Sequence, residues 1–297
     1  MPRGLATKTV AMTDAAYEIA AERQPISVRG IAYGLFTMGL IKDMNVNSTQ
    51  RVSRNLTTAR ENGVIPWEWI VDDSRRISGW RNWSDPSAFL QDIRTQYSRD
   101  RWETQPERLL VVSEKGTVGG VIQPVLSEYG VDHLIAHGFN SATLMMRVAN
   151  LSVSDDRPLT ILYIGDHDPS GMYMSVEDLP RRVEAYGGLV DIERVALTGE
   201  HVYIEHRELS KFPAKKSDPR YRWYVKSYGD TAWELDALDP RILRDALEEA
   251  IREHIDIDAW TWAERTNQAE FKSLEEFFDA NADLFCNQTQ NRIDGAS

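Results

Sequence analysis

Residues 159–171, LTILYIGDHDPSG, constrain the fold of this chain more than any other stretch. The apolar run at its start contains β-branched residues and has the length of a strand, as in parallel sheets that are buried on both faces. Asp166 and Asp168 follow the run two positions apart, and side chains at that spacing point the same way in extended chain. The stretch therefore predicts a buried strand that carries two carboxylates at its carboxyl end.

A second apolar run, RLLVVS at 108–113, ends in the same way in Glu114 and Lys115. Ligands of open parallel sheets collect outside the carboxyl ends of the strands. Glu114, Asp166 and Asp168 are thus expected to form one site with hard oxygen donors, which suits magnesium or manganese.

Length and composition restrict the remaining possibilities. A chain of 297 residues can form one large domain or two ordinary ones, each with its own core. The single cysteine, Cys286, excludes a disulfide framework and a zinc site built from cysteines. The sequence has no apolar run near 18 residues and no signal-peptide core at its start, so a cytoplasmic setting without membrane contact is expected.

The charge is distributed unevenly along the chain. The net charge is −12, but residues 1–107 carry 14 basic and 13 acidic side chains, whereas residues 108–297 carry 20 and 33. This balance argues against a generally basic surface for nucleic acid. A near-neutral amino-terminal module could still turn a basic face toward a polyanion.

Residues 1–78 are expected to form a winged-helix domain that binds DNA. Helices are predicted at 14–23, 28–41 and 49–62, and a short strand-like segment follows. Asn47 or Ser48 is expected to cap the third helix. Three helices followed by a strand is the element order of a winged helix-turn-helix. Arg51 and Arg54 on the third helix would then enter the major groove; the alternative is an ordinary solvated face.

In the second predicted helix, Arg29 and Tyr33 lie one turn apart. An arginine at this spacing can lower the pKa of the phenol and hold a phosphate beside it. The alternative is that Tyr33 is an aromatic residue at the edge of the core, packed against a neighbour.

Residues 79–107 are polar and are interpreted as a connecting segment with a helix over Pro86–Arg99. Strands and helices alternate from residue 108 onward, which predicts an α/β fold with a parallel sheet covered on both faces. Strands are predicted at 108–113, 131–136, 159–166 and 189–197, and helices at 117–129, 140–152 and 172–187. Helices at 240–254 and 274–285 are expected to extend this domain to residue 297.

A basic and aromatic cluster lies within the acidic half of the chain. It contains Lys215, Lys216 and Arg220, interleaved with aromatic residues. The cluster could track the phosphates of a nucleic acid, or it could be a solvated loop. No P-loop is present, so no motif for ATP hydrolysis is recognisable.

The pairs Glu114-Lys115 and Gly138-Phe139 and the run DHDPSG at 166–171 resemble the Toprim domain of the A subunit of topoisomerase VI and of the related meiotic double-strand-break protein. That family has a winged-helix domain before the Toprim domain, with its nucleophilic tyrosine in an Arg-x-x-x-Tyr pattern. Arg29 and Tyr33 match this pattern. The chain resembles compact, stand-alone A-subunit-like proteins of phages and bacteria more closely than the topoisomerase subunit itself.

The resemblance implies magnesium-dependent cleavage of double-stranded DNA, with Tyr33 forming a 5′-phosphotyrosyl link. It implies a homodimer, in which the metal of one subunit serves the tyrosine of the other, and a possible separate ATPase subunit. The implied catalytic residues are Tyr33, Arg29, Glu114 and Lys115, and the implied metal ligands are Glu114, Asp166 and Asp168. Glu234, in the run WELDAL, is implied to be a supporting acid.

Two alternatives to this transesterification remain open. Toprim sites also occur in nucleases, where water instead of a tyrosine attacks the phosphate. A non-catalytic DNA-binding protein on the same scaffold is the third possibility.

Overall fold

The computed structural model describes residues 7–71, 82–136, 142–203 and 209–294. Contacts divide the chain into two compact units. The first combines Met1–Arg75 with Glu107–His254, and the second combines Arg76–Pro106 with Ile255–Ser297. This grouping differs from the boundaries expected from the sequence, because it joins the amino-terminal module to the sheet and places the last helix with the connecting segment.

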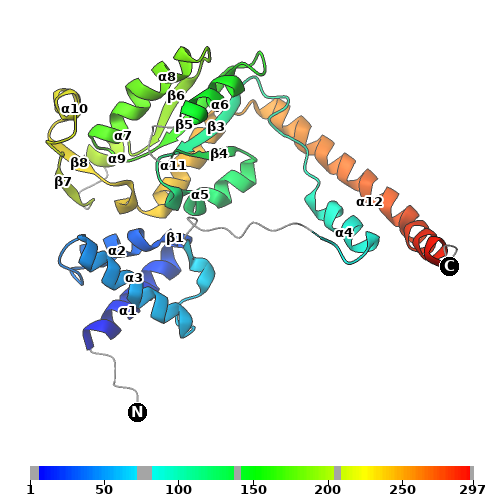
Figure 1. Ribbon diagram of the computed structural model, residues 1–297, viewed down its shortest axis with the longest axis horizontal. Helices are drawn as coiled ribbons and strands as arrows, with labels where there is room; N and C mark the ends of the chain where they lie inside the picture. Colours follow the sequence, from blue (N-terminus) through cyan, green and yellow to red (C-terminus); the bar gives the residue numbers. More distant parts are fainter. Residues whose placement is uncertain (1–6, 72–81, 137–141, 204–208, 295–297) are drawn as a thin grey trace. The chain divides into compact units, whose positions relative to one another are not determined.

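A parallel sheet of four strands forms the centre of the first unit (Figure 1). Its strands are β3 (Arg108–Ser113), β4 (Asp132–Ile135), β5 (Leu159–Ile164) and β6 (Asp191–Ala196). They are ordered β4-β3-β5-β6 and all run parallel. The predicted α/β class is confirmed, and the four predicted strands are present with ends shifted by two residues at most. All six residues of β5 are buried, as the unbroken apolar run requires.

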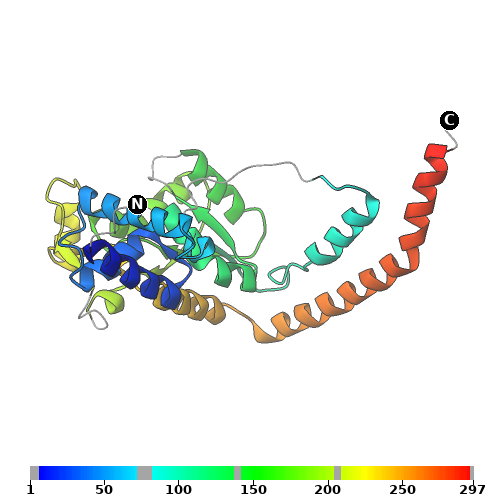
Figure 2. The ribbon, with the colours of Figure 1, turned by 90° about the horizontal axis from the view of Figure 1, so that it is seen from below.

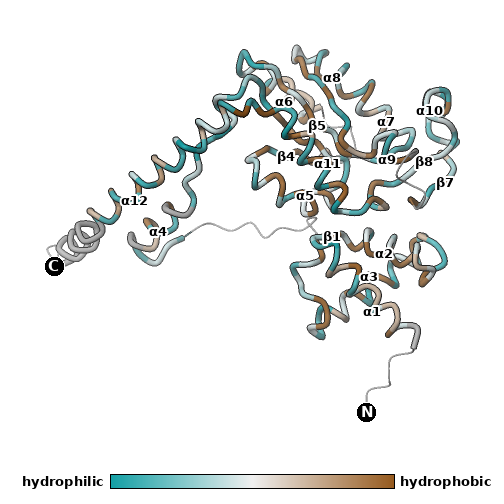
Figure 3. The backbone as a smooth tube through the Cα atoms, turned by 180° about the vertical axis from the view of Figure 1, so that it is seen from behind, coloured by the Kyte–Doolittle hydropathy of each residue, from teal (hydrophilic) through white to brown (hydrophobic). Residues whose placement is uncertain are grey.

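Helices cover both faces of this sheet, so the fold is layered (Figures 1 and 3). The helices are α5 (Gly116–Tyr129), α6 (Ala142–Ser152), α7 (Pro169–Tyr173), α8 (Leu179–Ala185) and α11 (Pro240–Glu253). Alternate residues of the strands, such as Leu110 and Ile161, pack with Val148 of α6 and Val183 of α8. Helices α5 and α11 contact one another and the strands β3 and β6, respectively.

One helix was predicted at 172–187, and the structure corrects this prediction. The chain forms α7, one π-helical turn η2 (Met174–Asp178), and then α8. The helix begins three residues earlier than predicted because Asp168 caps it. The Asp168 side chain accepts a hydrogen bond from Gly171 N at 2.7 Å, and Pro169 occupies the first helical position.

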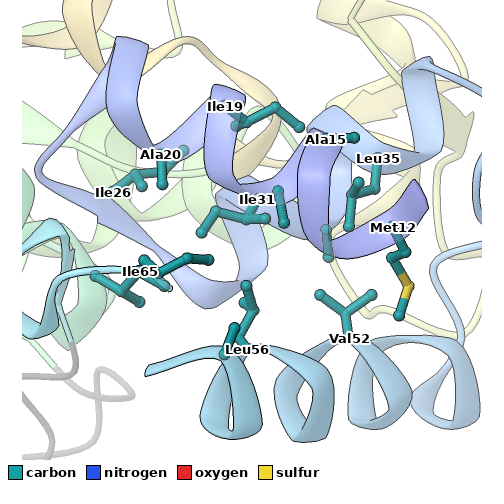
Figure 4. Packing of buried hydrophobic residues seen from close by; sticks show 14 of the residues in the cluster. Met12, Ala15, Ile19, Ala20, Ile26, Ile31, Leu35, Val52, Leu56 and Ile65 are labelled. Atoms are coloured by element: carbon teal, nitrogen blue, oxygen red, sulfur yellow. The ribbon is translucent and has the colours of Figure 1, made fainter. Parts of the chain in front are cut away.

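Three helices and two very short strands form the amino-terminal module. They are α1 (Thr7–Arg23), β1 (Ile26–Ser27), α2 (Val28–Thr37), α3 (Val46–Glu61) and β2 (Ile70–Val71), with a 3₁₀ turn η1 (Trp67–Trp69) before β2. Their apolar faces meet in one core, where Ile19 of α1, Ile31 of α2 and Leu56 of α3 are almost fully buried (Figure 4). This core explains why the three segments are helical, because each presents one apolar stripe to the others.

The predicted cap of the third helix is wrong by two or three residues. Asn45, and not Asn47 or Ser48, caps α3, and its side chain accepts a hydrogen bond from Ser48 N at 2.9 Å. The strands β1 and β2 pair in parallel. The order of helices and strands in this module is helix, strand, two helices and strand, whereas three helices followed by a strand were expected. Residues 72–81, which follow β2, lie outside the described part of the chain, so the winged helix stays a prediction.

A small subdomain follows the sheet and returns the chain to its carboxyl edge. It contains α9 (Gly199–Tyr203), β7 (Lys211–Pro213), α10 (Tyr221–Tyr228), β8 (Thr231–Trp233) and a 3₁₀ turn η3 (Leu235–Ala237). Strands β7 and β8 are antiparallel. The backbones of Trp233 and His167 exchange two hydrogen bonds of 3.0 Å. This bridge places the residues after β8 beside the loop that carries Asp166.

The second unit contains α4 (Pro86–Gln96) and α12 (Ile257–Asp294), a single helix of 38 residues (Figure 2). Glu270 of α12 accepts hydrogen bonds from Tyr97 Oη at 2.6 Å and from Arg99 Nη1 at 2.8 Å. The predicted helix at 274–285 is part of α12. The side chains of Phe285 and Cys286 lie outside the described residues. Within the described ranges, no helix combines the length and apolarity needed to cross a membrane.

Candidate functional site

The predicted acidic residues meet at the carboxyl edge of the sheet. Glu114 directly follows β3, and its backbone N donates a hydrogen bond of 3.0 Å to Ile164 O at the end of β5. Glu114 Oε2 accepts a hydrogen bond of 3.4 Å from Asp166 N. A Cβ atom added at Gly171 would lie 2.3 Å from Asp166 O and 3.1 Å from Glu114 Oε2. The glycine of the DHDPSG run is therefore required for this close approach.

The carboxylates are close enough to influence one another. Burial raises the pKa of Glu114 to about 7, with further contributions from the charges of Asp166 and Asp168, and Lys115 only partly opposes them. Burial also raises the pKa of Asp166, although Lys115 and the backbone N of Leu235 stabilise its carboxylate. The three acids thus share one electrostatic neighbourhood with an excess of negative charge.

The donor set fits a hard divalent cation in its chemistry, because three carboxylates without enough positive charge are what such a cation stabilises. Glu114, Asp166 and Asp168 would hold it. Among the residues that the structure describes, however, no three His, Cys, Asp or Glu side chains are grouped closely enough to count as a metal cluster. Asp166 Oδ1 instead accepts hydrogen bonds from Lys115 Nζ at 2.9 Å and from Leu235 N at 2.7 Å.

The raised pKa of Glu114 predicts a stability change in the metal-free protein. The folded state holds the Glu114 proton up to about pH 7, whereas the ordinary pKa of a glutamate is 4.5, so stability is lost as the pH rises between these values. Glu114→Gln should therefore increase the free energy of unfolding by about 3 kcal/mol at pH 8 and by less than about 1 kcal/mol at pH 5. Urea unfolding in EDTA measures this difference. Glu128→Gln, on the exposed side of α5, is the matched control; equal effects of the two variants would contradict the prediction.

Arg194 of β6 forms hydrogen bonds with the loop that carries Asp166 and Asp168. This role was not predicted from the sequence. Its guanidinium donates hydrogen bonds to the carbonyl oxygens of Gly165, Asp166, Gly171 and Leu197 and to Ser175 Oγ. Burial lowers its pKa, which the neighbouring acids oppose. Arg194 is one of three charged residues in β6, and this local sequence does not reveal its partners.

His167 lies between the two aspartates but belongs to the small subdomain's core. Its side chain is buried, and Nδ1 lies 2.8 Å from Tyr224 Oη. The rings of Tyr224, Tyr228 and Trp233 surround it edge-on at 5.5 to 5.8 Å. Burial lowers its pKa to about 4, with Arg194 acting in the same direction. His167 is therefore neutral near pH 7, and its packing fixes the loop between the two acids.

Tyr33 and Arg29 lie together on α2, as predicted. Arg29 Cζ is 5.7 Å from the centre of the Tyr33 ring, which is 6% exposed. The predicted effect on the phenol is wrong in its net direction. Burial raises the pKa of Tyr33, the carboxylate of Glu234 raises it further, and the opposing effect of Arg29 is smaller.

A chain of alternating charges connects Tyr33 to the acidic residues. Arg29 Nε donates a hydrogen bond of 2.7 Å to Glu234 Oε2, and Arg29 Nη2 contacts the same oxygen. Arg29 Nε also lies 3.6 Å from Asp236 Oδ2, which accepts a hydrogen bond of 3.0 Å from Lys115 Nζ. Glu234, which the resemblance implied to be a supporting acid, is thus the direct partner of Arg29.

The other predicted DNA-binding residues occupy two separate elements. Arg51 and Arg54 are exposed on α3, and Lys215 and Lys216 are exposed after β7. Arg220 is partly buried and forms an ion pair with Asp218 at 2.8 Å. The aromatic residues near Lys215, Lys216 and Arg220 pack mainly in a core, since Tyr224 is fully buried. The turn at Gly138-Phe139 lies outside the described residues.

Comparison with models of known protein families and with curated proteins finds no match to this chain.

Proposed function

We propose that this protein is a metal-dependent enzyme that cleaves DNA, with a winged-helix module and a Toprim-like α/β domain. The observation that supports this most is the convergence of Glu114 with the loop of Asp166 and Asp168 at the carboxyl edge of a parallel sheet. Ligands of such folds bind at this edge. The charge network also reaches Arg29, which lies beside Tyr33, the proposed nucleophile.

The proposed reaction is a transesterification. Tyr33 loses its phenolic proton, and its Oη forms a bond to phosphorus while the bond from phosphorus to the 3′ oxygen breaks. The products are a 5′-phosphotyrosyl link and a strand that ends in a 3′ hydroxyl after proton uptake. Arg29 would stabilise the phenolate and the phosphate charge. A magnesium or manganese ion at the carboxylates would polarise the phosphate and stabilise the leaving oxygen.

Partners follow from the same proposal. Double-stranded DNA is the substrate, and Arg51 and Arg54 on α3 would contact it in the major groove. Lys215, Lys216 and Arg220 would contact phosphates. A homodimer and a separate ATPase subunit are proposed from the resemblance to the topoisomerase VI A subunit.

One observation favours hydrolysis as a second candidate function. An ordinary phenol is about one part in a thousand phenolate at neutral pH, and burial and Glu234 make this fraction smaller for Tyr33. A water molecule attacking a phosphate at the same carboxylates would need no phenolate. The acidic site is common to both candidates.

Plasmid cleavage with and without protease separates the candidates. Supercoiled DNA is incubated with the protein and Mg²⁺ or Mn²⁺, and half of each sample is digested with protease before electrophoresis. We expect linear DNA that enters the gel only after digestion, because a covalently attached protein retards it. Linear DNA that runs freely in both halves would indicate hydrolysis, and intact plasmid in all samples would contradict cleavage.

A further inference from the structure

Two cations from different parts of the chain converge on one buried carboxylate. The side chain of Asp236 is 5% exposed, and its Oδ2 lies 3.0 Å from Lys115 Nζ and 3.6 Å from Arg29 Nε. Its other oxygen accepts a hydrogen bond of 3.2 Å from Ser27 Oγ. The two cations are more accessible than the acid, with side chains 28% and 39% exposed for Lys115 and Arg29.

Three consecutive residues of the chain engage the candidate site. Glu234 accepts hydrogen bonds from Arg29, Leu235 N donates one to Asp166 Oδ1, and Asp236 binds Lys115. The bridge between Trp233 and His167 holds the start of this segment against the acidic loop. The segment 234–236 therefore contacts the guanidinium of Arg29, the ammonium of Lys115 and the carboxylate of Asp166, a proposed metal ligand.

An arginine and a lysine that share one anion can also bind a phosphate, because both cations donate several hydrogen bonds to oxygens of one group. We propose that Arg29 and Lys115 form a single binding site for a phosphodiester of the DNA backbone, and that Glu234 and Asp236 fill this site in the free protein. The inference rests on the proposed function for its choice of ligand. Glu234 and Asp236 thus compete with DNA for the two cations, and we call this pair of residues the acidic latch.

The acidic latch also accounts for the state of Tyr33. In the closed arrangement burial keeps the pKa of Tyr33 high, and the carboxylate of Glu234 raises it further. A phosphodiester that displaces Glu234 from Arg29 brings its own negative charge, so the charge beside Tyr33 keeps its sign. Binding of DNA would exchange the carboxylate for the group that the phenol attacks.

The test measures DNA affinity in the absence of metal, where cleavage cannot contribute. Fluorescence anisotropy of a labelled 20-base-pair duplex is recorded in EDTA for the wild type, Glu234→Gln and Asp236→Asn across a range of salt concentrations. Each variant removes one of the two carboxylates that its cation contacts, which leaves the cation more available to DNA, so we expect binding about tenfold tighter than wild type. The slope of log affinity against log salt should steepen by about one for each additional phosphate contact.

Matched variants separate the acidic latch from a general effect of charge. Glu249→Gln removes one exposed carboxylate of α11 outside the network and should change affinity little. Adding Arg29→Gln to Glu234→Gln should abolish the gain, because the freed cation is then absent. Thermal unfolding of each variant verifies the fold, and Glu234→Gln, at a side chain 24% exposed, serves if Asp236→Asn fails to fold.

Two outcomes would overturn the acidic latch: Glu234→Gln binds DNA no more tightly than Glu249→Gln, or the gain survives in the double variant. Absence of DNA binding by every variant would overturn it as well. These results are distinct from failure of the proposed function, which is shown by intact plasmid in the cleavage assay whatever the affinities are.

Discussion

Replacing Tyr33 with phenylalanine should reduce formation of covalent protein–DNA complexes at least about a thousandfold, because the atom that bonds to phosphorus is removed. The phenyl ring keeps the packing of α2, where the Tyr33 ring is almost fully buried. Complexes that survive denaturation and disappear with protease are counted after incubation with plasmid and Mg²⁺.

Tyr17→Phe is the control for this experiment. Tyr17 lies on α1, is 41% exposed and packs against Trp69 at 5.4 Å, away from the charge network. Its replacement should leave complex formation at the wild-type level. Cleavage that continues in Tyr33→Phe without any attached protein would show that water is the nucleophile.

Replacing Asp168 with asparagine should reduce metal-dependent cleavage at least about a hundredfold and weaken Mn²⁺ binding, because a charged oxygen donor is exchanged for a neutral amide. The substitution is informative because asparagine caps helices as well as aspartate does. The hydrogen bond from Gly171 N that begins α7 can therefore persist. Electron paramagnetic resonance of free Mn²⁺ measures the affinity directly, and gel assays measure cleavage.

Asp132→Asn provides the control, since Asp132 is exposed at the beginning of β4 and thus at the opposite edge of the sheet. Its Mn²⁺ binding and cleavage should match those of the wild type. If Asp168→Asn also matches the wild type in both measurements, Asp168 takes no part in metal binding or cleavage. The third interpretation, a DNA-binding protein without catalytic activity, would be favoured if the wild type itself shows neither metal binding nor cleavage.

The sheet and its acidic edge were predictable because their signals are local. The unbroken apolar run of β5 can be stable only in the interior, and the polar residues that follow mark where the strand ends. Parallel pairing then brings Glu114 and Asp166 to one edge without further information. The cap of α3 was harder, since Asn45, Asn47 and Ser48 are all good caps and only the packing of the helix selects among them.

The electrostatic partners could not be predicted because they depend on contacts between distant parts of the chain. Arg29 and Glu234 are 205 positions apart, and no local pattern indicates that they meet. The spacing of Arg29 and Tyr33 correctly placed them together, but burial and Glu234 decide the pKa of the phenol. Arg194 was missed for the same reason, since the carbonyls of Gly165 and Asp166 become its neighbours only when β5 and β6 pair.

The guanidinium of Arg194 limits how far the main chain around Asp166 and Asp168 could move when a cation binds. It binds backbone oxygens on both sides of the two aspartates, so any shift of that loop would leave a largely desolvated charge without its acceptors. The loop is consequently rigid before an ion arrives, and binding should require side-chain rotation with little rearrangement of the main chain. A metal site built on these residues would be preorganised, with the entropy of ordering the ligands lost during folding instead of during capture of the ion.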